Sequence, residues 1–232
     1  MTTIYLVRHG QASFGAESYD KLSPNGELQA KVLGQYLDKI LKEAPYVVVG
    51  SMQRHQQTAN IALAESFPDS NLVTDSAWDE FNHQQVFAQY DPRFNQPHLL
   101  KQDVEQENSP REYLAKIFEG AIGRWTDGEY HHEYDESWPD FKNRVETALQ
   151  NLCDELAKTK PRYAVVFTSG GVISVAVGKL LELNPGRTFA LNWAVANTSF
   201  TTLRLVGNEP QLLSLNEHHY LKAEDPALLT WI

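Results

Sequence analysis

The chain has 232 residues, of which 42% are apolar, enough to build one sizeable hydrophobic core. Its 30 Asp and Glu residues outnumber 20 Lys and Arg residues, and the net charge of -10 argues against a nucleic-acid partner, because no basic surface would neutralise a phosphate backbone. The single cysteine, Cys153, excludes an internal disulfide and is expected in the core. No apolar run reaches membrane-spanning length and no leader-like segment opens the chain, so we expect a cytoplasmic protein with no membrane partner.

The first predicted element is a strand, the apolar run Ile4-Tyr5-Leu6-Val7, which places Arg8, His9 and Gly10 at its end. A guanidinium matches the planar spread of phosphate oxygens, an imidazole can attack phosphorus, and a glycine lets a ligand approach the backbone closely. Taken alone, the triplet is explained equally well as the polar turn after a strand, because Arg-His-Gly arises by chance in many proteins.

A helix is predicted next, with Ser23 as its cap and Pro24 in its first turn. Its apolar positions recur at helical spacing: Leu28, Val32, Tyr36, Leu37, Ile40 and Leu41. This pattern predicts an amphipathic helix that packs against the first strand's sheet.

A second strand over residues 46–49 leads into another polar cluster, Gly50-Ser51-Met52-Gln53-Arg54. Ser51 is expected to cap a second helix that holds Arg54 in its first turn, where a bound anion would offset the unfavourable position of a cation. The alternative is that Arg54 is an ordinary exposed helix residue, with His55 beside it on the surface.

The pattern weakens between Glu80 and Phe141, where four residue-proline pairs interrupt the chain. A short helix over residues 113–122 is predicted there. We expect residues 81–140 to form a lid-like insertion that helps to choose the substrate, as long segments near α/β sites often do. The side chains with metal-ligand chemistry are His131, His132, Glu133 and Asp135. A flexible polar stretch is the preferred interpretation of these residues, and no metal site is predicted.

The last third of the chain returns to strong patterns. A long helix is indicated by apolar residues at Phe141, Val145, Ala148, Leu149, Leu152, Cys153 and Leu156. A buried strand over residues 163–167 then leads into Thr168-Ser169-Gly170-Gly171, where another helix is predicted to begin. Two late strands, residues 199–206 and 212–215, flank a turn at Gly207-Asn208.

Strands that alternate with helices predict an α/β fold, a three-layer sandwich with a mainly parallel sheet and helices on both faces. We expect a single domain over residues 1–232. Ligands of open α/β sheets bind beyond the carboxyl ends of the strands. The polar clusters that follow the three apolar strands are therefore expected to converge on one crevice.

An ordered series of motifs over most of the chain resembles the histidine phosphatase superfamily, also called the phosphoglycerate mutase-like family. The motifs are Arg8-His9-Gly10, Leu22-Ser23-Pro24-Asn25-Gly26-Glu27-Leu28-Gln29-Ala30, Arg54 with Gln57-Thr58-Ala59, Trp78-Asp79-Glu80, Gly170-Gly171 and Asn197-Thr198-Ser199. The ordered series is far more specific than any single motif.

The resemblance implies that His9 is the phosphate-accepting nucleophile and that Arg8 and Arg54 bind the phosphoryl oxygens. It also implies that Glu80 is the proton donor, with Asp79 as the rival acid. These roles are chemically coherent, because phosphoryl transfer needs in-line positioning and neutralised equatorial oxygens, which two arginines provide without a metal. We expect no cofactor.

The chain departs from the family pattern at Ser169, where relatives usually carry a second histidine. Losing that charge-assisted contact costs about 1.5–3 kcal/mol, or roughly 10- to 200-fold in rate if the loss falls on the transition state. Ser169 and the Gly170 amide at the helix start can still bind an anion, although Ser169 and Thr168 are equally well read as a helix cap. The histidines that can fill in are His55, His83 and His218. If the missing donor limits catalysis, Ser169→His raises the rate.

These observations predict a phosphohydrolase that acts on a small phosphomonoester through a phosphohistidine at His9. One alternative is a catalytically weak or inactive relative that binds a phosphorylated ligand or a protein partner. The other is a phosphoglycerate mutase-type phosphotransferase, which is less favoured because Gln11-Ala12-Ser13 replaces the acid and Trp-Asn pair of the mutases. The sequence does not predict the oligomeric state.

Overall fold

A computed structural model describes residues 1–13 and 20–231. Its contacts divide the chain into two compact units. The sheet unit comprises Met1–Glu80 and Val145–Ile232, and the insert unit comprises Phe81–Arg144. The boundaries of the insert unit lie close to those of the insertion expected from the sequence, and its action as a lid remains a prediction.

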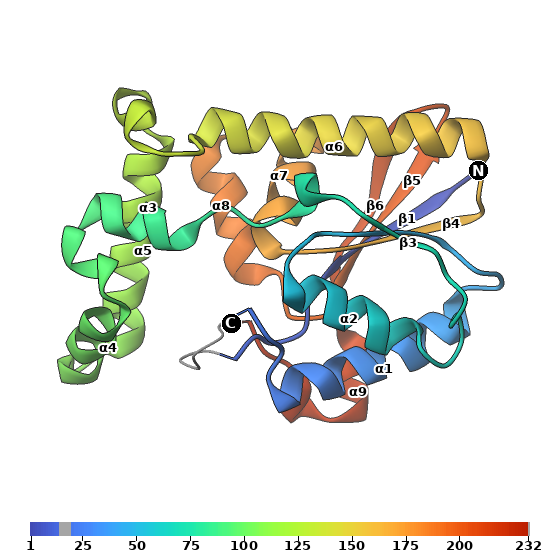
Figure 1. The fold of residues 1–232 in the computed structure, drawn as a ribbon, viewed down its shortest axis with the longest axis horizontal. Coiled ribbons are helices and arrows are strands. Elements are labelled where there is room, and N and C mark those ends of the chain that lie inside the picture. Colours follow the sequence, from blue (N-terminus) through green and yellow to red (C-terminus); the bar gives the residue numbers. More distant parts are fainter. Residues whose placement is uncertain (14–19, 232) are drawn as a thin grey trace. The chain divides into compact units, whose positions relative to one another are not determined.

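The sheet unit is built on a six-stranded sheet with the order β3-β2-β4-β1-β5-β6 (Figure 1). Its strands are β1 (Thr3–Arg8), β2 (Tyr46–Val49), β3 (Leu72–Thr74), β4 (Tyr163–Thr168), β5 (Phe200–Val206) and β6 (Glu209–Glu217). β3, β2, β4 and β1 run parallel, whereas β5 is antiparallel to both β1 and β6. Arg8 pairs with Thr168, and Val49 pairs with Phe167, so the carboxyl ends of β1, β2 and β4 are level with one another.

Both faces of the sheet are covered, which confirms the predicted three-layer α/β architecture. The helices of this unit are α1 (Pro24–Ile40), α2 (Gln53–Leu63), α7 (Gly170–Leu180), α8 (Pro185–Ala194), α9 (His219–Glu224) and the later part of α6 (Trp138–Thr159). α1, α2 and α9 lie on one face, while α7 and α6 beyond residue 144 lie on the other (Figure 1). The buried residues of the central strands are therefore almost continuous, as in sheets covered on both sides.

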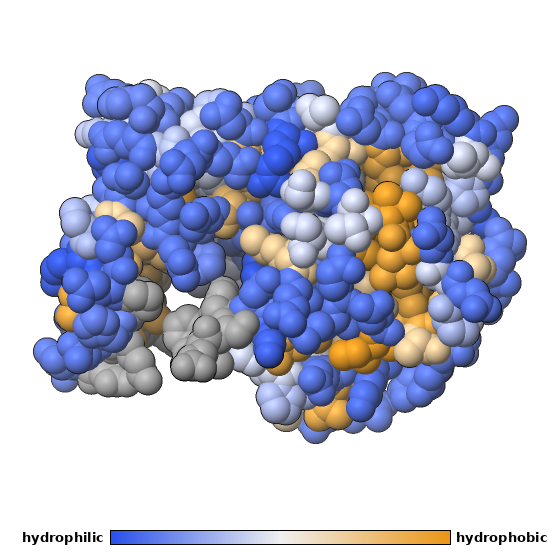
Figure 2. Space-filling model, viewed as in Figure 1, coloured by the Kyte–Doolittle hydropathy of each residue, from blue (hydrophilic) through white to orange (hydrophobic). Residues whose placement is uncertain are grey.

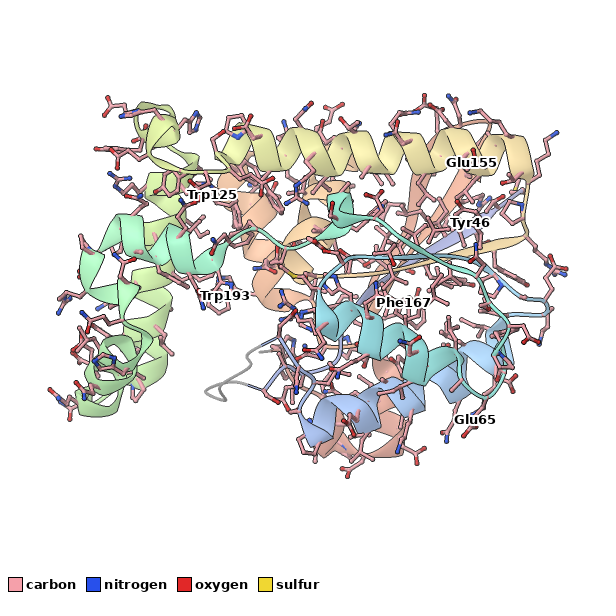
Figure 3. The ribbon with its side chains drawn as sticks, viewed as in Figure 1. Tyr46, Glu65, Trp125, Glu155, Phe167 and Trp193 are labelled. Atoms are coloured by element: carbon pink, nitrogen blue, oxygen red, sulfur yellow. The ribbon has the colours of Figure 1, made fainter. Side chains whose placement is uncertain are left out.

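Alternate residues of the central strands face different layers. Tyr5, Val165 and Phe167 belong to one core cluster with Leu33 of α1 and Ala62 of α2. The labelled Phe167 lies between the sheet and α2 (Figure 3). Residues at the intervening positions, such as Leu6 and Val166, are also fully buried. The outward side of α6 is mostly hydrophilic (Figure 2), as expected for a helix whose apolar stripe is buried.

The insert unit is largely helical. It contains α3 (His83–Tyr90), α4 (Pro97–Gln106), α5 (Pro110–Thr126), the first residues of α6 and short 3-10 helices over Pro92–Asn95 and Gly128–Glu133. Its core is aromatic: the Trp125 ring, labelled in Figure 3, lies 4.7 Å from Phe81 and 5.7 Å from Trp138, measured between ring centroids. The sequence predicted only residues 113–122 as helical. The prolines read as interruptions instead occupy the first turns of α4 and α5, where the missing N–H costs nothing.

The first predicted helix is confirmed as α1, and the Ser23 side chain caps it by accepting from the Gly26 amide. Its buried face differs from the apolar pattern, since Leu28 is 51% exposed. The buried positions are Gly26, Gln29, Ala30, Leu33, Gly34 and Leu37. α1 packs so closely on α2 that a Cβ on Gly34 would lie 2.4 Å from the Ala62 carbonyl oxygen, so small residues face the core here.

The predicted cap of α2 is wrong. The Ser51 hydroxyl donates to Asp79 instead, and the first amide of the helix, Gln53 N, donates to an Asp20 carboxylate oxygen at 2.7 Å. The predicted long helix, the helix that begins at Gly170 and the late hairpin are confirmed as α6, α7 and β5–β6. The sequence analysis did not predict β3, α8 and α9, of which β3 and α9 are short. Within the described residues, no helix is long and apolar enough to cross a bilayer.

Candidate active site

The backbone at the end of β1 is held by several neighbouring elements. The His9 amide donates to the Thr168 carbonyl at 2.9 Å, continuing the β1–β4 ladder, and the Asn197 side chain donates to the His9 carbonyl at 3.2 Å. The Gly10 amide donates to the Thr58 hydroxyl of α2 at 3.0 Å. Because these bonds come from β4, α2 and the segment before β5, the position of His9 is determined by the packed sheet.

The His9 imidazole has a defined tautomer. Its Nδ1 lies 2.7 Å from the Gly10 carbonyl oxygen, which can only accept, so Nδ1 carries the proton. Its Nε2 accepts from Arg54 Nε at 3.2 Å. Burial lowers the pKa of His9 well below 6.5, and the charges of Arg54, His55 and Arg8 lower it further. His9 is therefore neutral near pH 7, with the Nε2 lone pair facing a guanidinium.

Arg54 is 5% exposed, which excludes the alternative of an ordinary exposed helix residue. Its Nη1 lies 2.7 Å from an Asp20 carboxylate oxygen, and the other oxygen of this carboxylate accepts from Gln53 N at the start of α2. A helix N-terminus beside an arginine is a favourable place for an anion. An internal carboxylate therefore occupies the position that suits a phosphoryl group.

The side chain of Arg8, the last residue of β1, lies beside Gly170, the first residue of α7. Its Nη1 donates to the carbonyl oxygens of Val195, at 2.5 Å, and Trp231, at 3.1 Å. A Cβ built on Gly170 would be 3.5 Å from Arg8 Nε and only 2.3 Å from Asn192 Oδ1. The Asn192 side chain therefore leaves no room for a side chain at position 170, whereas the distance to the guanidinium is an ordinary contact. Asn192 of α8 borders the site without having been singled out in the sequence.

His55 is fully buried, contrary to the surface position expected for it. Its Nε2 lies 2.7 Å from Ser169 Oγ, and its ring centroid lies 5.5 Å from that of His9. A signal for this burial is present in the sequence, because His55, Thr58, Ala59 and Ala62 have the i, i+3, i+4, i+7 spacing of one helix face. Ser169 stands at the start of α7 but makes no side-chain cap.

The side chains of Asp79 and Glu80, although adjacent in sequence, contact different parts of the sheet unit. The Asp79 carboxylate accepts from the Ser51 amide at 2.6 Å and lies 3.7 Å from His55 Nδ1, the range of an ion pair. Burial would raise the pKa of Asp79, but its interactions with His55 and Ser51 hold it below its ordinary value. Glu80 instead accepts from the Gly171 amide at 3.0 Å, at the start of α7. Asp79 therefore contacts His55 and the segment before α2, and Glu80 is the acid that contacts the glycine pair.

The other candidates, His218, His83 and Cys153, have surroundings that differ from those of His9. His218 stacks on His219 with ring centroids 5.2 Å apart, and His83 belongs to α3 of the insert unit, beside Phe87. Burial raises the pKa of the Cys153 thiol to about 12, so this cysteine is unreactive. Across residues 1–13 and 20–231, no group of three or more His, Cys, Asp or Glu side chains has the arrangement of a metal site.

Acidification is expected to destabilise the protein through the two buried imidazoles. The pKa values of His9 and His55 are both lowered from 6.5, in each case mainly by burial, so below about pH 6.5 the unfolded chain binds protons that the native state does not. The free energy of unfolding should fall by up to about 1.4 kcal/mol per pH unit for each imidazole. Urea denaturation at pH 7.5, 6.5 and 5.5 measures this slope, and equal stability at the three values would contradict it.

Removing the internal carboxylate is expected to strengthen anion binding. Asp20→Asn keeps an acceptor for Gln53 N but loses the charge that competes for Arg54. Asp20 is 40% exposed, so the gain is modest, about two- to fivefold in the inhibition constant of inorganic phosphate. Competitive inhibition assays measure it, with exposed Asp69→Asn as the matched control. Unchanged or weaker inhibition by phosphate in Asp20→Asn would contradict the expectation.

Solved structures of other proteins share the fold of this chain. Similar folds include a phosphoglycerate mutase from Bacillus anthracis str. Sterne (TM-score 0.63, 18% identity, covering 95% of each chain). Another is a phosphoserine phosphatase mutant from Entamoeba histolytica in complex with phosphoserine (TM-score 0.63, 18% identity, covering 95% of this chain and 100% of that one). A third is a mycobacterial glucosyl-3-phosphoglycerate phosphatase with inorganic phosphate (TM-score 0.61, 19% identity, covering 95% and 99%). No curated protein matches the chain significantly.

At these identities the structural likeness shows the fold, which confirms the predicted α/β class. The family itself is shown by sequence. The family model for the histidine phosphatase superfamily (branch 1) matches residues 4–92 and 103–218, which include Arg8, His9, Arg54, Glu80 and Ser169. This chain therefore belongs to the histidine phosphatase superfamily, branch 1.

Proposed function

We propose that this protein is a phosphohydrolase that acts on a small phosphomonoester through a phosphohistidine at His9. One observation carries the proposal: unprotonated Nε2 of His9 lies 3.2 Å from Arg54 Nε, while Nδ1 is engaged by a backbone carbonyl. A neutral imidazole nucleophile beside a guanidinium is the combination that phosphoryl transfer to histidine requires.

In the first step, the phosphoryl group of the substrate enters beside Arg54, and its oxygens replace the Asp20 carboxylate and His9 Nε2 as acceptors. The His9 Nε2 lone pair attacks phosphorus, and the bond from phosphorus to the ester oxygen breaks. Glu80 gives its proton to the departing alkoxide, and the alcohol leaves. Arg8 and Arg54 neutralise the charge on the equatorial oxygens.

In the second step, water attacks phosphorus and the P–N bond to His9 breaks. The Glu80 carboxylate takes a proton from the attacking water, which returns the acid to its starting state and releases inorganic phosphate. Overall, one phosphomonoester and one water give one alcohol and one phosphate. The chain's own arginines supply the positive charge in both steps.

Phosphate monoesters of an amino acid and a three-carbon acid are sensible first substrates, because a related fold carries phosphoserine and another is a phosphoglycerate mutase. The experiment measures phosphate release from a panel that includes phosphoserine, 3-phosphoglycerate and a chromogenic aryl phosphate. Rapid quenching with labelled substrate should trap acid-labile, base-stable phosphohistidine. Turnover without labelled His9 would contradict the mechanism.

The same panel separates the alternatives. A mutase-type transferase would label His9 but pass the phosphoryl group to a hydroxyl of a second substrate faster than to water. A binding relative would bind inorganic phosphate with neither turnover nor labelling. Gln11-Ala12-Ser13 after the triplet supports the hydrolase over the mutase, because the mutases it resembles carry an acid and a Trp-Asn pair there.

A further inference from the structure

Three polar side chains of the sheet unit, Asp79, His55 and Ser169, contact one another in sequence close to His9. Asp79 Oδ1 lies 3.7 Å from His55 Nδ1, and His55 Nε2 lies 2.7 Å from Ser169 Oγ. His55 and Ser169 are fully buried, and the Asp79 side chain is 17% exposed. Burying an imidazole and a hydroxyl is costly unless they bond to each other or to another partner. The contact between His55 and Ser169 offsets part of that cost.

The contact between Asp79 and His55 requires a residue without a side chain at position 50. Gly50, at the end of β2, has no side chain, and a Cβ built there would lie 2.2 Å from His55 Nδ1 and 2.8 Å from Asp79 Oδ1. Ser169 stands where a serine commonly caps a helix, yet its hydroxyl is turned to His55.

We propose that Asp79 and His55 form a buried relay that orients the Ser169 hydroxyl toward the phosphoryl group bound at His9, which makes His55 a positioning residue of this site. The inference rests on the proposed function. It assigns to His55 of α2 and to Ser169, which precedes α7, together the donor role that the family resemblance implies for a histidine at position 169.

The number of protons that each of the three groups carries explains how the relay works. A serine hydroxyl has one proton to donate, and when His55 Nε2 is unprotonated that proton is directed to the ring. When Nε2 carries a proton, it donates to Ser169 Oγ, and the hydroxyl proton is available to a phosphoryl oxygen. In that state Nδ1–H faces the Asp79 carboxylate at 3.7 Å, the distance of an ion pair, so the charge of the ring is compensated.

The charges around His55 make this protonation depend on the ligand. Arg54 opposes it, Asp79 and Asp20 favour it, and the neutral His9 ring lies 5.5 Å away. Burial is the largest effect and keeps the pKa of His55 below 6.5 without ligand. A phosphate dianion at Arg54 and His9 adds negative charge nearby, so phosphate binding should draw one proton from solvent onto His55.

The relay also changes what is expected of Ser169→His. His55 Nε2 already lies in contact with Ser169 Oγ, so an imidazole at position 169 has no room while His55 is present. We therefore expect Ser169→His alone to lower activity. Combined with His55→Ala, which empties that volume, Ser169→His should recover at least part of the rate.

The test uses the full chain and compares His55→Ala, Ser169→Ala and the variant with both changes. Each single change should lower kcat/KM by about 10- to 100-fold, and the double variant should be no worse than either single one, because the two side chains act as one donor. Exposed His219→Ala is the control. Additive losses, or kcat/KM values equal to wild type, would overturn the relay.

His55→Gln provides a variant that keeps a donor at the Nε2 position but does not titrate. It should retain more activity than His55→Ala and lose the proton uptake. Calorimetry with inorganic phosphate at pH 8, in buffers of different ionisation enthalpy, measures that uptake: about one proton in wild type and none in His55→Gln. Equal uptake in both proteins would overturn the relay even if His55→Ala fails to fold.

The failure of the relay and the failure of the proposed function give different results. If wild type shows neither turnover nor phosphohistidine, the hydrolase proposal fails, while phosphate calorimetry still tests the relay. If wild type hydrolyses phosphomonoesters through His9 but the His55 and Ser169 variants match it, the relay alone fails. Absence of phosphate binding by wild type contradicts both.

Discussion

His9→Ala is expected to reduce phosphomonoester turnover by at least about 1,000-fold and to abolish covalent labelling of the protein. The structure holds the unprotonated Nε2 of His9 against Arg54 Nε at 3.2 Å, so His9→Ala removes the group that we propose attacks phosphorus. His55 cannot substitute, because it is fully buried and its Nε2 is engaged with Ser169. The measurement is single-turnover phosphate release with parallel trapping of labelled protein.

The control for His9→Ala is inorganic phosphate binding. Arg8, Arg54 and the α2 N-terminus remain, so the variant should still bind phosphate while it fails to turn over substrate. His219→Ala, which alters an exposed histidine, should behave as wild type in both assays. Undiminished turnover by His9→Ala would remove His9 from the mechanism, whatever the phosphate affinity.

Arg54→Met is expected to lower kcat/KM by about 100- to 1,000-fold and to move the acid limb of the pH profile to higher pH. The loss in rate follows because one of the charges that neutralise the phosphoryl oxygens disappears. The pH shift has a separate cause: Arg54 is the largest charge effect that lowers the pKa of His9, after burial. Without it the pKa of His9 rises, and more of the nucleophile is protonated at a given pH. Measuring kcat/KM from pH 5 to 8 tests both effects.

Arg54→Lys is the matched comparison. It keeps a positive charge but loses the planar guanidinium that reaches His9 and Asp20 with different nitrogens. Its pH profile should stay close to that of wild type, while its rate falls between those of wild type and Arg54→Met. A uniform loss of rate in Arg54→Met, with an unmoved acid limb, would show that the guanidinium does not control the protonation of His9.

Patterns of neighbouring residues allowed the strongest structural predictions. Continuous apolar runs identified β1, β2 and β4, and helical periodicity identified α6 and the helix that begins at Gly170. The insert unit was predicted poorly because α3 is short and rich in amides and α4 begins at a proline, so neither has a long apolar stripe. The short β3 and α9 have too few residues for any periodicity to register.

Part of the candidate site could also be predicted from residues that are neighbours in the sequence. The residues at strand ends, Arg8, His9 and Ser169, stand directly after apolar runs, and parallel strands bring such ends to one edge. Ser51 was wrongly predicted as a cap, because the position of Asp79 relative to α2 is not encoded in local spacing. The burial of His55 was readable from its helical spacing but was not used, whereas its contact with Ser169 is not encoded in that spacing.

The sequence by itself determined the fold class and the strand-end positions of His9 and the arginine beside it, because these follow from residues that are neighbours in the chain. Only the tertiary structure decided which other groups meet them. His55 contacts Ser169, 114 positions away, because the N-terminus of α2 packs beside the carboxyl end of β4. Asp20, in the segment before α1, contacts Arg54, 34 positions away. Such contacts depend on how distant segments pack, and the periodicity of a single segment carries no information about its partner.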